Sequence, residues 1–389
     1  MDAARLVEDF RHGDFLLATD TSTLLASGIG AEIVDTDEDA LTDRVTRILR
    51  DRDHRGPSTD DEADIRTAVG VLPFDAASST PARMVVPATL RSAGPPHPGA
   101  GRLERLDVPT PSAIRAVPSE DAHMSAVATA VTELAVRDLR KVVLARALDV
   151  EFTEPVPTEA IAGNLVRDNR HGYVFAAGLP GERALVGASP ELLVSRHGRQ
   201  VVSHPHAGSM PRSADPEVDA ANARRLLSSK KDRVEHAVLT EAVAETLRPF
   251  CSRLDVPDEP RLERTPTMWH LGTRITGELA DPDVTALRLA AALHPTPAIC
   301  GTPTSSAREL VRELEPFDRG YYAGTVGWVN ADGDGEWAVS IRCADTGAKH
   351  LRMYAGGGIV PDSDPRAELD ETSAKFATLA RAMGLDTSE

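Results

Sequence analysis

Short runs of alternating or continuous apolar residues make up most of this chain, and a few stretches with helical spacing separate them. The apolar runs predict strands at 141–152, 173–179, 184–189, 192–203, 265–279, 321–330, 336–344 and 350–355. Helical spacing predicts helices over 121–139, 216–249, 284–293, 305–314 and 365–384. Residues 1–110 contain only shorter strand-like pieces and are the least informative part of the sequence.

The order of these elements indicates the fold class. Strands come in groups with helices between them, and they do not alternate strictly with helices, which favours an α+β domain with largely antiparallel sheets. The block 110–389 shows no linker composition. We therefore expect one domain over 1–389, in which residues 1–110 pack onto the rest and residues 115–385 carry the chemistry.

Charge and cysteine content restrict the possible partners. The net charge is −17, which argues against nucleic acid or an anionic membrane as the main partner. A local basic pocket or a bound metal can still attract a small anion. The three cysteines lie far apart without a paired motif, so we expect buried thiols. The absence of a signal-like start and of a membrane-length apolar run favours a cytoplasmic protein.

Lysine is rare in this chain, and two lysines lie in unexpected places. Lys and Arg together number 43, of which only five are Lys. Lys141 begins the apolar run Lys-Val-Val-Leu-Ala-Arg, and Lys375 follows two acids in a helix-like segment. A lysine in a dry pocket can lose its proton, whereas arginine cannot. We therefore interpret Lys141 and Lys375 as site residues.

The C-terminal region contains the strongest local pattern, a glycine triplet at 356–358 followed by a helix with two acids and a lysine. Glu368, Glu371 and Lys375 fall on one face of that helix, beside its apolar stripe. Carboxylates held this close share a proton or a cation, and oxygen ligands favour Mg²⁺. A solvated helix face with a Glu371–Lys375 ion pair is the alternative. The triplet either lets backbone N–H groups approach an anion or forms a tight turn.

Two further glutamates are candidates for chemistry. Glu191 lies at the junction of two apolar strands, where low polarity would raise its pKa and suit a general acid. Its alternative is a solvent-facing glutamate at a strand edge. Glu235 lies beside apolar positions of the long helix and could hold a metal with Glu371. It could equally form a surface ion pair with Lys231.

His270 and Arg342 complete the candidates that rest on the residues alone. A lone histidine such as His270 is usually a satisfied core or edge residue. Arg342 lies in an apolar strand and needs an anionic partner, because an unpaired buried charge is costly. That partner is a protein acid or a ligand carboxylate.

Taken together and in this order, the motifs resemble those of the chorismate-utilising enzymes, which include isochorismate, salicylate, anthranilate and aminodeoxychorismate synthases. The resemblance covers roughly residues 115–385. It rests on the Lys141 run, Gly-Ala-Ser-Pro-Glu at 187–191, Ala-Gly-Ser at 207–209, Lys231 to His236, 298–303, Arg342 and the 356–375 ending. It implies the fold of anthranilate synthase component I, a two-layer antiparallel β sandwich with flanking helices.

The resemblance also implies roles for these residues. Neutral Lys141 would take a proton from a water that attacks C2 of chorismate, and Glu191 would protonate the departing C4 hydroxyl. The environments of the two groups should then push their pKa values apart. Mg²⁺ would be held by Glu235, Glu371 and Glu368 and would bind the ring carboxylate. The substrate-binding residues implied are Gly208, Ser209, His270, Ala298, Tyr322, Arg342, Gly356 and Lys375.

Within the family, two positions favour one reaction. Members that add water carry Lys where this chain has Lys141, and salicylate synthases carry Thr where it has Ala298. We therefore expect an isochorismate synthase of the siderophore (2,3-dihydroxybenzoate) type, acting as a monomer without a glutaminase subunit. Alternatives are a salicylate synthase, a menaquinone-type isochorismate synthase, a two-carboxylate sugar hydrolase and a non-catalytic chorismate-binding relative. The aromatic content of 4% weakens the hydrolase.

Overall fold

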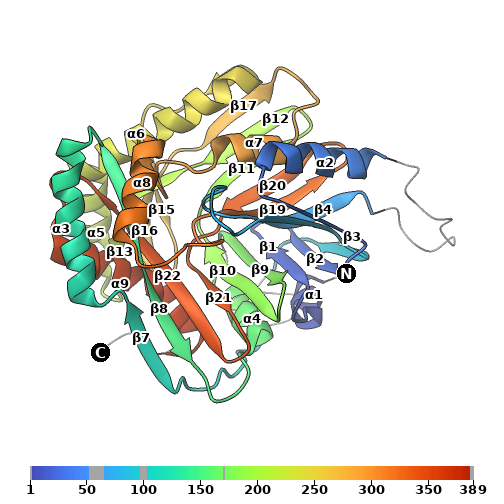
Figure 1. Ribbon diagram of the computed structural model, residues 1–389, viewed down its shortest axis with the longest axis horizontal. Helices are drawn as coiled ribbons and strands as arrows, with labels where there is room; N and C mark the ends of the chain where they lie inside the picture. Colours follow the sequence, from blue (N-terminus) through green and yellow to red (C-terminus); the bar gives the residue numbers. More distant parts are fainter. Residues whose placement is uncertain (1, 52–64, 97–102, 170, 386–389) are drawn as a thin grey trace.

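Two large antiparallel β-sheets pack on each other at the centre of the protein, shown as a computed structural model in Figure 1. The structure describes residues 2–51, 65–96, 103–169 and 171–385. The ten-stranded sheet has the order β18 (Gly301–Thr302), β8 (Lys141–Glu151), β22 (His350–Ile359), β21 (Cys343–Thr346), β10 (Arg183–Ser189), β9 (Tyr173–Leu179), β1 (Phe15–Ala18), β2 (Thr23–Ser27), β6 (Thr89–Ala93), with β7 (Ala113–Val117) paired to β8.

The second large sheet has nine strands, and a small sheet lies beside it. The order in the nine-stranded sheet is β14 (Cys251–Asp255), β17 (Ile275–Leu279), β12 (Gln200–His204), β11 (Leu192–His197), β20 (Gly335–Val339), β19 (Thr325–Asn330), β4 (Thr67–Leu72), β5 (Ala82–Val86), β3 (Ala31–Asp35). The small sheet has the order β13 (His206–Pro211), β16 (Met268–Gly272), β15 (Arg261–Arg264). Residues 1–110 thus supply three strands to each large sheet.

Helices cover the outer faces of the sheets and the small sheet. They are α1 (Ala3–Asp9), α2 (Glu38–Arg50), α3 (Glu120–Val136), α4 (Thr158–Asp168), α5 (Pro216–Ser228), α6 (Lys230–Leu247), α7 (Ala286–Leu293), α8 (Thr304–Leu314) and α9 (Pro365–Ala382). Asp364 caps α9 by accepting a hydrogen bond from the N–H of Ala367, and Pro365 occupies its first turn. Within the described ranges, none of the helices combines the length and apolar character needed to cross a membrane.

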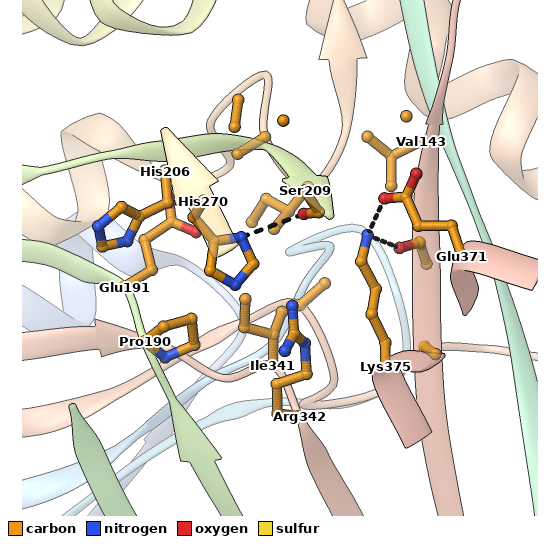
Figure 2. Close-up of a pocket in the computed structure, with 18 of the residues that line it drawn as sticks. Val143, Pro190, Glu191, His206, Ser209, His270, Ile341, Arg342, Glu371 and Lys375 are labelled. Atoms are coloured by element: carbon orange, nitrogen blue, oxygen red, sulfur yellow. Dashed lines mark hydrogen bonds and ion pairs between the residues drawn. The ribbon is translucent and has the colours of Figure 1, made fainter. Parts of the chain in front are cut away.

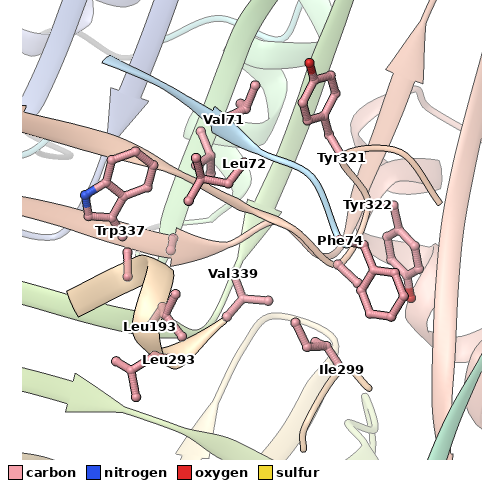
Figure 3. Close-up of a cluster of buried hydrophobic side chains, with 14 of the residues drawn as sticks. Val71, Leu72, Phe74, Leu193, Leu293, Ile299, Tyr321, Tyr322, Trp337 and Val339 are labelled. Atoms are coloured by element: carbon pink, nitrogen blue, oxygen red, sulfur yellow. The ribbon is translucent and has the colours of Figure 1, made fainter. Parts of the chain in front are cut away.

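Alternation along the strands explains the two layers. In β1, Phe15 and Leu17 pack into the core between the sheets, whereas Leu16 and Ala18 pack into a second core beneath α1, α4 and α9. Trp337 of β20 is fully buried in the inter-sheet core (Figure 3). Because helices cover its outer face, the ten-stranded sheet carries buried apolar residues on both faces. The predicted fold class, an antiparallel sandwich with flanking helices, is confirmed.

Several predicted boundaries were wrong for local reasons. The helix expected over 216–249 is divided at Ser229, whose extended backbone and side-chain oxygen cap the start of α6. The strand expected over 192–203 is a hairpin that turns at Gly198, which has φ of +58°. The strand expected over 265–279 is two strands that belong to different sheets. The strand expected at 321–330 begins only at Thr325, after a turn, and the strand expected at 336–344 is broken by an irregular segment at 340–342.

A buried ion pair holds β8 to its neighbours. Arg319 and Glu315 are four residues apart, with side chains only 2% and 3% exposed. Arg319 also donates to the carbonyls of Val143 and Ile299, at 2.7 and 2.8 Å, and Glu315 accepts from the N–H of Ala145 at 2.7 Å. The pair therefore ties the first part of β8 to the segment before β18.

We expect Arg319→Met to lower the free energy of unfolding by roughly 3–5 kcal/mol, because it leaves the Glu315 carboxylate buried without its partner. The matched control is Arg366→Met, which removes an i,i+4 pair with Asp370 whose side chains are 69% and 62% exposed. That change should cost about 0–1 kcal/mol. Urea unfolding of both variants measures the difference, and equal losses would contradict a stabilising role for the buried pair.

Candidate active site

A pocket with about 710 Å³ of space not filled by protein atoms lies between one end of the ten-stranded sheet, the small sheet and helices α6 and α9. Its walls come from β8, β13, β16, β22, α6, α9 and the turns between strands of different sheets. Eleven of the thirteen residues predicted for the site line it, namely Glu191, Gly208, Ser209, Glu235, His270, Ala298, Tyr322, Arg342, Gly356, Glu371 and Lys375. Lys141 and Glu368 lie just behind this lining.

Glu191 lies where the chain crosses from one sheet to the other, between the end of β10 and the start of β11. It is 3% exposed. Burial raises its pKa to about 8, although a hydrogen bond from the backbone N–H of His206 and the charges of Lys141 and Arg342 oppose the shift. The carboxyl is therefore largely protonated at neutral pH, as a proton donor requires. The solvent-facing alternative is wrong.

Arg342 comes from a second crossover, between β20 and β21, next to the first. The N–H of Val339 donates to the carbonyl of Glu191, and the N–H of Ala188 donates to the carbonyl of Arg342, both at 3.1 Å. Arg342 has φ of +52°, and its side chain points into the pocket (Figure 2). Burial lowers its pKa to about 10. Among the described residues no acid forms a hydrogen bond with its guanidinium, and its pairing with a ligand carboxylate stays a prediction.

Three lysine–glutamate pairs surround one side of the pocket. Lys141 Nζ lies 2.7 Å from Glu235, and its side chain is 3% exposed. Lys375 Nζ lies 2.7 Å from Glu371, and Lys231 Nζ lies 3.2 Å from Glu368. The Glu371–Lys375 ion pair that belonged to the alternative interpretation is therefore present, but its side chains are only 29% and 13% exposed, so the helix face is not solvated. Lys231 contacts Glu368, so the alternative surface pair with Glu235 is not formed.

The charges around these acids shift the pKa values of Glu368 and Glu235. Burial raises the pKa of Glu368, and the charge of Glu371 raises it further. Burial alone would raise the pKa of Glu235, but Lys141, Lys375 and Lys231 together lower it. Each of the three lysines therefore balances the charge of one carboxylate, and the three ion pairs together form one cluster of charges.

The glycine triplet forms part of β22, where it pairs with residues 143–145 of β8, so the predicted tight turn is wrong. A Cβ on Gly358 would lie 2.7 Å from Lys141 Cε and 2.8 Å from Glu235 Oε1. A Cβ on Gly356 would lie 2.8 Å from the Tyr322 hydroxyl. The triplet thus makes room for site side chains, and the carbonyl of Gly356 accepts a hydrogen bond from Lys375 at 2.8 Å.

His270 and Ser209 face the pocket from neighbouring strands of the small sheet. The Ser209 hydroxyl lies 3.1 Å from His270 Nδ1, as Figure 2 shows. His270 Nε2 is buried and has no hydrogen-bond partner within the described part of the chain. Burial holds the pKa of His270 well below its usual value, so the ring is neutral. A neutral ring with an open nitrogen can donate to or accept from a ligand.

Two polar side chains that line the pocket, those of Tyr354 and His206, were not identified from the sequence. Tyr354 stacks on Tyr322 with ring centroids 4.8 Å apart, and together they form one wall. His206 lies beside Glu191, directly before the Ala-Gly-Ser motif at 207–209. The two histidines on either side of Pro205 could have indicated that His206 belongs to the site. No sequence feature indicated Tyr354, because a tyrosine in a strand ordinarily packs in the core.

The acids predicted to hold Mg²⁺ match that ion in their donor chemistry, since all offer carboxylate oxygens. Glu368 Oε2 is buried and lacks a hydrogen-bond partner among the residues described. As arranged, no three acidic, histidine or cysteine side chains in the described ranges are placed to hold a metal ion. The donor set fits Mg²⁺ chemically, and its assembly around an ion stays a prediction.

This arrangement combines a protonated carboxyl, a buried amine and an unpaired guanidinium around one pocket. The carboxyl comes from the crossover after β10, the amine from the start of β8 and the guanidinium from the crossover after β20. Together these groups can protonate a leaving group, accept a proton and bind an anionic substrate.

Comparison with known proteins identifies the family. A family model described as a chorismate binding enzyme matches residues 104–384. Isochorismate synthase DhbC of Bacillus subtilis is 46% identical over 394 residues, covering 99% of this chain and 97% of the relative. The vibriobactin-specific isochorismate synthase of Vibrio cholerae is 41% identical over 331 residues, covering 85% and 82%.

A solved structure supports the same family assignment. The crystal structure assigned as the 2,3-dihydroxybenzoate-specific isochorismate synthase DhbC of Bacillus anthracis superposes with a TM-score of 0.91 at 42% identity. The match covers 99% of this chain and 100% of that one. The predicted family is confirmed: the chain belongs to the chorismate-binding enzymes.

Proposed function

We propose that this protein is an isochorismate synthase that converts chorismate to isochorismate, in a pathway to 2,3-dihydroxybenzoate. The observation that carries the proposal is the buried Glu191, which lines the pocket and whose pKa of about 8 keeps it protonated at neutral pH. Relatives aligned over nearly the whole chain are isochorismate synthases, which supports the same activity.

In the proposed reaction the two ends of the pocket act together. Lys141 acts in its neutral form, after it has released its own proton, and accepts a proton from a water whose oxygen forms a bond to C2 of the ring. The ring double bonds shift, the C4–O bond breaks, and Glu191 protonates the departing oxygen, so that water leaves. No oxidation occurs. Arg342 pairs with the enolpyruvyl carboxylate, and Tyr322 and Tyr354 hold the ring side of the substrate.

We propose that Glu235, Glu368 and Glu371 hold Mg²⁺. A bound divalent cation would offset the repulsion between an acidic site and a dianionic substrate. The lysines that contact these acids carry the positive charge that balances the three carboxylates when no cation is bound.

The direct test is to incubate the purified protein with chorismate and Mg²⁺ and to separate the products by chromatography. Isochorismate is expected. Unchanged chorismate at every metal concentration would overturn the proposal, and salicylate with pyruvate would replace it with the lyase.

Metal removal should abolish turnover. After dialysis against a chelator we expect no isochorismate, and titration with Mg²⁺ should restore it. Glu371→Gln should raise the Mg²⁺ concentration for half-maximal activity at least about 10-fold, because it removes a charged ligand. The control is Glu241→Gln, an exposed acid on the same helix as Glu235. Full activity in the chelated enzyme would contradict a metal requirement.

Ala298 should control whether the hydroxylated ring keeps its enolpyruvyl group. It lies in the pocket wall, and the resemblance predicts that a threonine hydroxyl there promotes loss of pyruvate. We expect Ala298→Thr to release some pyruvate, measured with lactate dehydrogenase, whereas Ala298→Val, which has the same shape without the hydroxyl, should not. A threonine variant that makes isochorismate and no pyruvate would exclude Ala298 as the switch.

The proposal also concerns partners. Water is the nucleophile, so no subunit that supplies ammonia is needed, and we propose a cytoplasmic monomer without a glutaminase partner. Size-exclusion chromatography with light scattering would show the mass of one chain.

A further inference from the structure

A second cavity, which we name the rear cavity, lies behind Glu191. It contains about 890 Å³ of space not filled by protein atoms. Its lining includes His171, Pro190, His204, His206, Glu263 and His270. Pro190, His206 and His270 line both this cavity and the active-site pocket. Only these three residues are shared, so they form the partition between the two spaces.

His206 is the part of this partition that touches Glu191. Its backbone N–H donates a hydrogen bond to the Glu191 carboxyl. In Figure 2 that carboxyl lies between the rings of His206 and His270. Both ring nitrogens of His206 are buried, and neither has a hydrogen-bond partner in the described part of the protein. A fully buried imidazole with two open nitrogens is costly unless water or a ligand satisfies it.

The histidines form a series that leads outward. The rings of His204 and His206 lie 4.5 Å apart, and those of His206 and His270 lie 6.0 Å apart. Burial lowers the pKa of His204 to about 4 and holds that of His206 well below its usual value. Each ring is therefore neutral and carries one N–H and one free nitrogen lone pair, the pair of sites that a proton relay needs.

The outer end of the series reaches solvent. His204 Nε2 lies 3.7 Å from Glu263, whose side chain is 41% exposed. His171, on the same cavity wall, is exposed. The rear cavity thus reaches from the partition beside Glu191 to the surface, on the side of the partition away from the substrate pocket.

The proposed function creates a need for such a route. Each turnover moves a proton from Glu191 to the departing oxygen and another from water to Lys141. Before the next cycle Glu191 must regain a proton and Lys141 must lose one. A bound substrate or product blocks the pocket side of Glu191, so direct exchange with solvent there is restricted.

We propose that the rear cavity returns protons to Glu191 and that His206 is the positioning residue that relays them. Neither ring nitrogen of His206 contacts Glu191 directly, so the relay passes through water on both sides. Water in the rear cavity gives a proton to one ring nitrogen, and the other nitrogen gives its proton through a bridging water to the Glu191 carboxylate. The hydroxide left in solvent is neutralised by the proton that Lys141 releases before the next cycle. This inference rests on the proposed role of Glu191 as the acid.

The test is a kinetic comparison of His206→Phe with the wild type, using chorismate and Mg²⁺. Phenylalanine keeps a ring of similar size but cannot carry a proton. We expect kcat to fall about 10-fold with an unchanged KM, and the solvent deuterium isotope effect on kcat to increase. His206→Asn, which is smaller and polar, should behave in the same way if the phenylalanine variant folds poorly.

Chemical rescue separates a relay from simple packing. In His206→Ala, added imidazole can enter the rear cavity and should restore much of kcat, whereas it should not restore Glu191→Gln. The matched control is His123→Phe, because His123 is buried with an open Nε2 but lines neither cavity. That variant should keep the kcat and the isotope effect of the wild type.

The outcomes distinguish this inference from the proposed function. If the wild type forms no isochorismate, the function is wrong and the relay falls with it. If the wild type is active and His206→Phe and His206→Asn keep its kcat and isotope effect, only the relay is overturned.

Discussion

Glu191→Gln is expected to lower kcat for isochorismate formation roughly 100- to 10,000-fold, with little change in KM. The amide has nearly the shape of the protonated carboxyl, so it can keep the hydrogen bond from the backbone N–H of His206. It cannot give a proton to the departing oxygen. Single-turnover and steady-state rates with chorismate measure the effect.

The control for this change is Glu336→Gln. Burial raises the pKa of Glu336 to about 7, so it too is an unusual buried carboxyl, but it does not line the pocket. Its variant should retain wild-type kcat. A Glu191→Gln enzyme with the same kcat as this control would exclude Glu191 as the acid.

The pH dependence gives an independent reading of the same group. An acid catalyst works in its protonated form, and Glu191 has a pKa of about 8 because of burial. The wild-type rate should therefore be insensitive to protonation of Glu191 well below pH 8 and should fall as the pH rises through about 8. In Glu191→Gln that fall should disappear, because the titrating group has been removed.

The fold class could be predicted because each strand keeps its own alternation of apolar and polar residues. The exact bounds of the strands and helices could not be predicted. The turn at Gly198 and the helix break at Ser229 each depend on one residue inside a continuous apolar or helical pattern. The crossovers at Glu191 and Arg342 also cannot be predicted from the periodicity of apolar residues. A strand that ends in one sheet and a strand that begins in another have the same alternation.

The site could be predicted further than the fold, because charged residues in apolar runs require an explanation. Glu191 and Arg342 both stood out in this way, and both line the pocket. The partners of the lysines could not be predicted. Lys231 contacts Glu368 across 137 positions of sequence, and nothing in the spacing on α6 distinguishes that contact from one with Glu235.

Lys141→Met is the second change with a large expected effect, a loss of kcat of roughly 100- to 10,000-fold. The same change leaves Glu235 without its 2.7 Å partner in a buried place. It should therefore also lower the free energy of unfolding by about 3 kcal/mol or more. Lys349→Met, at an exposed lysine, is the control that should change neither quantity.

Lys141→Met removes an ion pair and a base together, so a second variant, Lys141→Arg, is needed to separate the two effects. Arginine keeps the positive charge and can keep the contact with Glu235, but it does not release its proton at any useful pH. If Lys141 is the base, Lys141→Arg should fold nearly as well as the wild type, by urea unfolding, and remain as inactive as Lys141→Met. If its contribution is only the ion pair with Glu235, arginine should restore turnover. Near wild-type kcat in Lys141→Arg would therefore assign the proton abstraction to another group and leave Lys141 with a structural role.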